Sequence, residues 1–167
     1  HGAGLTPAPF LIRGEKMKIL VAGYGNPFRQ DDRVGHELTP MIAEFLRGEG
    51  AEVEEWTDQQ LLPEIVEDMR DKDLAIFVDA SADNSNEKFF IQDIVPSPDL
   101  EGLNIHSMGP GWVLDLMQKL KIPFPQTLLV SVSGESFDFS EEMTPQCKEN
   151  VLKALEAFKE WWSAKTH

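Results

Sequence analysis

The chain has little cysteine and few basic residues. Its one cysteine, Cys147, can form neither an intramolecular disulfide nor a zinc site built on cysteine pairs. A lone cysteine fits a reducing compartment, so we expect a cytoplasmic protein. Lysine and arginine number 15 against 29 aspartate and glutamate residues, and the resulting formal charge of −14 repels phosphate backbones and anionic lipid. Binding to nucleic acid or to a membrane surface is therefore not expected.

Long apolar runs and a secretion signal are also missing. No uninterrupted apolar stretch is long enough to cross a bilayer, which predicts a soluble protein. Residues 1–16 hold a short apolar cluster with no basic region ahead of it, so we interpret them as a leader or an expression-derived segment. The remaining length is enough to bury one proper core but not two, which predicts a single domain over residues 17–167.

Strands and helices alternate along this domain. Short apolar runs predict strands over 18–23, 51–56, 74–80, 88–94 and 127–134. Apolar residues at helical spacing predict helices over 34–48, 61–70 and 109–120 and from Thr144 onward. Alternation of this kind is typical of a three-layer α/β/α sandwich, in which helices cover both faces of a twisted, mostly parallel sheet, here with five strands.

Acidic residues follow the predicted strands where such folds place their sites, beyond the carboxyl ends of the parallel strands. Asp31 and Asp32 come after the first strand, Asp79 ends the third, and His106 precedes the helix predicted over 109–120. Adjacent carboxylates repel each other unless a cation or a shared proton offsets the repulsion. Two aspartates and a histidine would suit a divalent transition metal with open coordination positions.

Structural roles can also explain some of these residues. Asp32 could cap the helix that follows it, and Asp31 could do the same and leave Asp32 free. His106 could likewise cap the helix after it, so spacing alone leaves both roles open. Asp79 is harder to explain in this way, because a carboxylate at the end of a buried strand needs a partner.

Other familiar motifs are incomplete. The stretch "GYGN" begins like a dinucleotide-binding loop, but Phe28 stands where that pattern has its third glycine, and no Walker lysine follows. Cys147 has no histidine close in sequence, which favours a packed thiol. The serines of "VSVSGES" would need a positioned base to act as nucleophiles, so a serine-hydrolase site is a minor alternative.

Three blocks, "GYGNPFRQDDRVG", "FVDA" and "IHSMGP", together resemble the hydrogenase maturation endopeptidases, which trim the large subunits of nickel-iron hydrogenases. The resemblance covers nearly the whole chain from Met17 and implies a twisted five-stranded sheet between helices. It also implies a metal-binding triad of Asp32, Asp79 and His106. The chain departs from the family at Arg33, where a glycine is frequent, and at "TDQQLLPEI", where several members have an Asp-Gly-Gly turn.

The resemblance implies an endopeptidase that removes a C-terminal extension from the large-subunit precursor after nickel insertion. The nickel would arrive with the substrate and would not be bound permanently. Asp32 and Asp79 could serve as general base as readily as metal ligand. Residues expected to assist substrate recognition are Gly23, Gly25, Asn26, Asp31 and Asp58. We expect a monomer whose partner is the hydrogenase precursor.

Two other functions remain open at this level. A non-catalytic, nickel-dependent assembly factor could bind the precursor through the same three residues without cutting it. A small-molecule hydrolase could use Asp31 and Asp32 as an acid–base pair. A mass change at the C-terminus of the precursor separates the endopeptidase from the assembly factor, and activity without a protein substrate would indicate the hydrolase.

Overall fold

The computed structural model describes residues 16–82, 87–98 and 109–166, so residues 1–15 of the expected leader lie outside it. Five strands form one sheet in the order β2-β1-β3-β5-β4. The strands are β1 (Lys18–Tyr24), β2 (Glu52–Asp58), β3 (Leu74–Ser81), β4 (Phe89–Asp93) and β5 (Gln126–Ser133). All neighbouring strands pair in parallel except β4, which runs antiparallel to β5. The predicted mostly parallel five-stranded sheet is confirmed.

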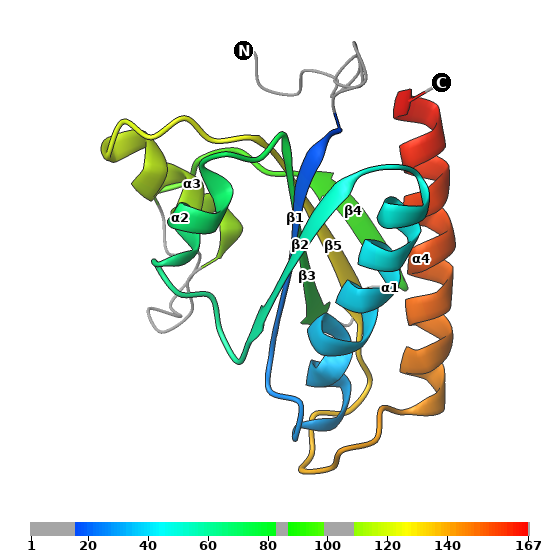
Figure 1. The fold of residues 1–167 in the computed structure, drawn as a ribbon. Coiled ribbons are helices and arrows are strands. Elements are labelled where there is room, and N and C mark those ends of the chain that lie inside the picture. The colour runs from blue at the N-terminus through cyan, green and yellow to red at the C-terminus, as the bar shows by residue number, and fades with distance from the viewer. Residues whose placement is uncertain (1–15, 83–86, 99–108, 167) are drawn as a thin grey trace.

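Helices cover both faces of the sheet (Figure 1). The long helices α1 (Val34–Gly48) and α4 (Pro145–Thr166) pack on one face, whereas α2 (Ile65–Met69) and α3 (Pro110–Lys119) pack on the other. The three-layer prediction is therefore confirmed. In the described ranges, no helix is long and apolar enough to cross a bilayer.

Side chains of the central strands alternate between the two layers of core. Ile19 and Val21 of β1 join the cluster under α1 and α4, and Leu20 and Ala22 join the cluster under α2 and α3. A strand buried on both faces needs apolar residues at every position, which explains the continuous apolar run at the start of the domain.

Two helix starts show how local sequence sets the element boundaries. The Thr144 Oγ1 accepts a hydrogen bond from the Cys147 N–H at 3.2 Å, which confirms Thr144 as the cap of α4. The helix α2 begins only at Ile65, later than the predicted residue 61. Proline disfavours helical backbone in the residue before it, so Leu62 stays outside the helix and Pro63 forms a turn ahead of it.

Candidate active site

A row of polar side chains crosses the carboxyl ends of the parallel strands. The strand register pairs Asp58 of β2 with Tyr24 of β1, and Asp79 of β3 with Ser131 of β5. Tyr24 and Asp79 lie on adjacent strands and are in contact, because the Tyr24 hydroxyl donates a hydrogen bond to Asp79 Oδ2 at 2.9 Å. Val78, the residue before Asp79, packs toward α1 and α4. The row therefore lies on the opposite face, which α2 and α3 cover.

Asp79 carries the most perturbed carboxylate of this row. Burial raises its pKa from 3.8 to about 6; the Ser131 and Tyr24 hydroxyl groups act against this rise, and the charge of Asp32 adds to it. The other oxygen, Oδ1, is inaccessible to solvent and has no hydrogen-bond donor in suitable geometry among the described residues. An orphaned carboxylate oxygen is suited to accept a proton or to bind a cation.

Tyr24 stays a hydrogen-bond donor to this carboxylate. Burial raises its pKa well above the usual value of 10.0, and the negative charge of Asp79 acts in the same direction. The hydroxyl group therefore keeps its proton at neutral pH and holds Asp79 Oδ2 in place. This arrangement leaves Oδ1 as the carboxylate oxygen without a hydrogen bond among the described residues.

Asp32 lies in a short 3-10 helix, η2 (Gln30–Arg33), which connects the loop after β1 to α1. Its Oδ2 accepts the Asn26 N–H at 2.6 Å, and α1 begins with no side-chain cap. The helix-capping interpretation of Asp32 is wrong, because the 3-10 turn directs its carboxylate back toward the strand end. Burial raises the pKa of Asp32, and the Asn26 N–H and the charge of Arg29 act against that rise.

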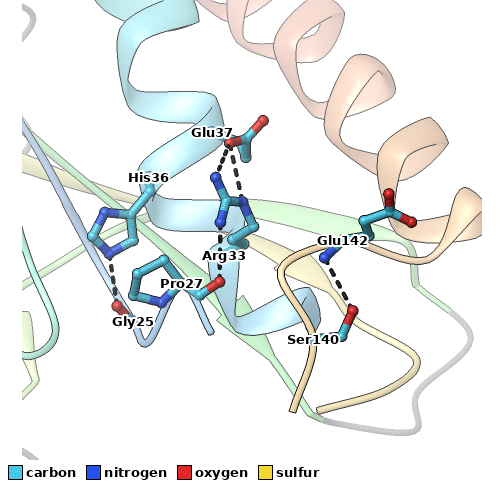
Figure 2. Close-up of polar contacts among 7 residues, drawn as sticks. All are labelled: Gly25, Pro27, Arg33, His36, Glu37, Ser140 and Glu142. Atoms are coloured by element: carbon cyan, nitrogen blue, oxygen red, sulfur yellow. Dashed lines mark hydrogen bonds and ion pairs between the residues drawn. The ribbon is translucent and has the colours of Figure 1, made fainter. Parts of the chain in front are cut away.

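The loop after β1 is held by side chains from the end of η2 and the first turn of α1 (Figure 2). The His36 Nε2 lies 2.7 Å from the Gly25 carbonyl oxygen, to which it donates. Arg33 donates from Nη1 to the Pro27 carbonyl at 3.0 Å and pairs with Glu37 at 3.2 Å. Arg33 is at one of the two places where the chain departs from the family that it resembles. Its contacts therefore fix the loop that carries Asn26.

The glycines of this region allow close contact between backbones. A Cβ atom on Gly35 would lie 2.5 Å from the Tyr24 backbone, and one on Gly23 would collide with the Gly35 carbonyl. Gly25 has φ +140°, and a side chain there would collide with the Asp32 carbonyl. Gly23 and Gly25 are buried and allow α1 to pack closely against β1, and their predicted part in substrate recognition stays a prediction.

Asp31 has a structural role. Its side chain is 0% exposed, and its two oxygens accept four hydrogen bonds. The donors are the N–H groups of Glu135, Ser136 and Thr144 and the Thr144 hydroxyl, at 2.7–3.1 Å. Neither substrate recognition nor an acid–base pair with Asp32 is compatible with this burial, which corrects both expectations for Asp31.

The remaining predicted residues fall into three groups. Asn26 and Asp58 are half-buried at the edge of the site, and Asp58 Oδ1 accepts the Gln59 N–H at 2.6 Å. Cys147 is buried in the core, which confirms the packed thiol, and burial raises its pKa to about 12. His106 lies outside the described residues, although α3, which follows it, packs on the face that carries Asp79.

The metal triad therefore stays a prediction. Within residues 16–82, 87–98 and 109–166, no three His, Cys, Asp or Glu side chains lie close enough together to hold a metal ion. Two of the three predicted ligands, Asp32 and Asp79, are close enough for the charge of one to raise the pKa of the other. Carboxylates with an orphaned oxygen fit a divalent cation that brings part of its own ligand set.

Sequence reasoning missed two members of the polar row. Tyr24 is the only tyrosine of the chain and ends a buried strand, and this polar end position was the signal that could have revealed it. Ser131 was considered only as a nucleophile. In the structure it is buried beside Asp79, where its hydroxyl group stabilises the carboxylate.

Comparison with known proteins finds no matching family model and no matching curated protein. Solved structures do match. An endopeptidase from Escherichia coli is 28% identical, with a TM-score of 0.63 over 85% of this chain and 90% of that chain. The hydrogenase maturating endopeptidase HybD from Escherichia coli is 25% identical, with a TM-score of 0.58 over the same shares.

A third structure, the nickel-iron hydrogenase maturation protease HycI from Thermococcus kodakarensis, has a TM-score of 0.61 over 87% of this chain and 92% of that chain. At 23% identity, it supports the fold alone. In these three structures the match covers 85–87% of this chain. The shared fold and the three sequence blocks together support the resemblance of the chain to the hydrogenase maturation endopeptidases.

Proposed function

We propose that this protein is an endopeptidase that removes a C-terminal extension from the nickel-loaded large-subunit precursor of a nickel-iron hydrogenase. The observation that carries the proposal is the pair of carboxylates at the sheet edge. Asp32 and Asp79 interact electrostatically there, and Asp79 Oδ1 is left without a donor among the described residues. A nickel ion already held by the precursor would supply the missing partner.

Nickel belongs to the substrate in this proposal. Asp32 and Asp79, together with the predicted ligand His106, would hold the ion through carboxylate and imidazole groups, which divalent transition metals accept. Holding an ion that is fixed within the precursor places the scissile peptide bond beside the two aspartates. A precursor without nickel would lack this anchor, so cleavage would wait for metal insertion.

Asp79 is the stronger candidate for the general base of peptide hydrolysis. A base works best when its pKa lies close to the working pH, and burial has moved the pKa of Asp79 to about 6. The Tyr24 hydroxyl holds Oδ2, so Oδ1 would either contact the ion or, with Asp32 and His106 holding the ion, take the proton of an attacking water that enters with the substrate. Asp32 would then position the ion, and the same proton would pass to the leaving amine.

The proposal includes a cytoplasmic location and a monomeric state. A single cysteine fits a reducing compartment, where the thiol of Cys147 stays reduced within the core. Size-exclusion chromatography with light scattering tests the monomer directly.

The experiment that tests the function is intact-mass analysis of a hydrogenase large-subunit precursor after incubation with the protein. Nickel-loaded and nickel-free precursors are compared, with Asp79→Asn as the inactive variant and the exposed Asp93→Asn as the matched control. We expect wild type and Asp93→Asn to remove a C-terminal peptide from the nickel-loaded precursor and to leave the nickel-free precursor intact. Binding of the loaded precursor without any mass change would refute the endopeptidase and favour an assembly factor.

A further inference from the structure

Two loops far apart in sequence are joined at the edge of the sheet that carries the site. The first loop, residues 25–33, follows β1, and the last loop, residues 134–144, follows β5 (Figure 1). Backbone hydrogen bonds link Gln30 to Ser140, Ser140 to Phe28 and Asp31 to Ser136, at 2.9–3.0 Å. The paired loops therefore form one unit.

The buried carboxylate of Asp31 makes this unit rigid. Its four hydrogen bonds all come from the last loop, and the Arg29 Nε adds a bond to the Phe137 carbonyl at 3.0 Å. Separating the loops would break four hydrogen bonds to a charged acceptor, and such charge-assisted hydrogen bonds are among the stronger ones in proteins. Because Asp32 follows Asp31 directly, the unit has a fixed position relative to the site.

Two large apolar side chains are exposed on the paired loops. Phe28 is 53% exposed and Phe139 is 81% exposed, and the Arg29 guanidinium carbon lies 4.8 Å from the centre of the Phe139 ring. Aromatic and arginine side chains are the residue types that dominate binding energy at protein interfaces. Their backbone is already fixed here, so less conformational entropy is lost on binding.

The surroundings of these phenylalanines are acidic. The last loop carries the exposed residues Glu135, Asp138, Glu141 and Glu142 and has no lysine or arginine. A partner segment that covers the phenylalanines would gain from basic side chains at its margins. A second copy of this chain, with its own charge of −14, would be repelled, as would anionic lipid.

We propose that the paired loops are the docking surface for the protein substrate, and that the docking segment of the precursor is apolar with basic residues on its margins. The inference rests on the proposed function and adds the surface through which the precursor is held. Asn26 connects Phe28 to the site, because its side-chain oxygen accepts the Phe28 N–H at 2.9 Å and its own N–H donates to Asp32 Oδ2 at 2.6 Å, so a protein seated on Phe28 lies beside Asp32. The surface supplies affinity, whereas Asp32 and Asp79 supply the chemistry.

The test measures cleavage of the nickel-loaded precursor as a function of its concentration. The variant is Phe28→Ala combined with Phe139→Ala, and the control is Leu152→Ala on α4, where the leucine is 56% exposed. We expect the double variant to raise KM at least tenfold with kcat within twofold, and the control to match wild type. Glu141→Gln with Glu142→Gln should raise KM and weaken its dependence on salt.

The outcomes separate this inference from the proposed function. If the wild type cleaves and the double variant keeps the KM of Leu152→Ala, or loses kcat instead, the docking surface is overturned. If the wild type never cleaves, the proposed function fails, and the docking surface is tested by titrating the precursor against wild type and double variant. Equal affinity in that titration overturns it. Thermal unfolding shows whether the double variant is folded. If it is not, Phe139→Ala alone replaces it in both measurements.

Discussion

Replacing Asp79 by asparagine should stabilise the protein while removing its activity. Asparagine has nearly the same shape and still accepts the Tyr24 hydrogen bond, but it carries no charge into the buried site. Folding raises the pKa of Asp79 from 3.8 to about 6. At about 1.4 kcal/mol per pH unit, this rise means that the ionised carboxylate lowers the free energy of unfolding by about 3 kcal/mol at pH 7.

The sign of the pH dependence follows from the raised pKa. The folded protein binds this proton more tightly than the unfolded chain, so the contribution of Asp79 to stability falls as pH rises from about 4 to about 6. Asp79→Asn should therefore gain about 3 kcal/mol at pH 7 but less than about 1 kcal/mol at pH 4. Well below pH 3.8 the carboxylate is protonated in both states, and the difference should vanish.

Urea unfolding of wild type and Asp79→Asn at pH 4, 5, 6 and 7 measures this difference. The exposed Asp93→Asn on β4 controls for removing one negative charge from an acidic protein, and it should show no comparable gain. Equal stability of wild type and Asp79→Asn at pH 7, or a gain that persists unchanged at pH 4, would refute the reasoning. Cleavage of the loaded precursor by Asp79→Asn would remove Asp79 from the catalytic site.

Four further changes test other parts of the structure. Asp31→Ala leaves four donors without their acceptor and should cost about 3–5 kcal/mol in urea unfolding; a loss under 1 kcal/mol would contradict the anchoring role. Gly35→Ala forces a Cβ against the Tyr24 backbone and should cost about 1–3 kcal/mol and slow cleavage, whereas Gly48→Ala, at an open position, should not. Arg33→Gly should lose about 1 kcal/mol, because one hydrogen bond and one half-exposed ion pair disappear; unchanged stability would show that the loop does not need Arg33. His106→Ala should abolish cleavage with unchanged stability, and full cleavage by the folded variant would remove His106 from the predicted triad.

The two adjacent aspartates show where sequence reasoning ends. Both follow the same strand, and local pattern allowed either of them to cap the next helix. Their roles differ because the last loop, more than 100 residues away, supplies the four donors that surround Asp31. No local sequence pattern predicts that contact. The role of Arg33, where the chain departs from the family pattern, likewise became clear only from its hydrogen bond to the Pro27 carbonyl, which the folded loop brings within 3.0 Å.

The sequence by itself determined the order of strands and helices, the mostly parallel sheet and the edge at which polar residues gather. Hydrophobic periodicity and strand-end residues are local properties, and they depend on few distant contacts. The tertiary structure decided which carboxylate is buried as an anchor, which one has a raised pKa, and which aromatic side chains are left exposed. Those properties arise from strand register and loop pairing, because burial and hydrogen bonding depend on neighbours that are distant along the chain.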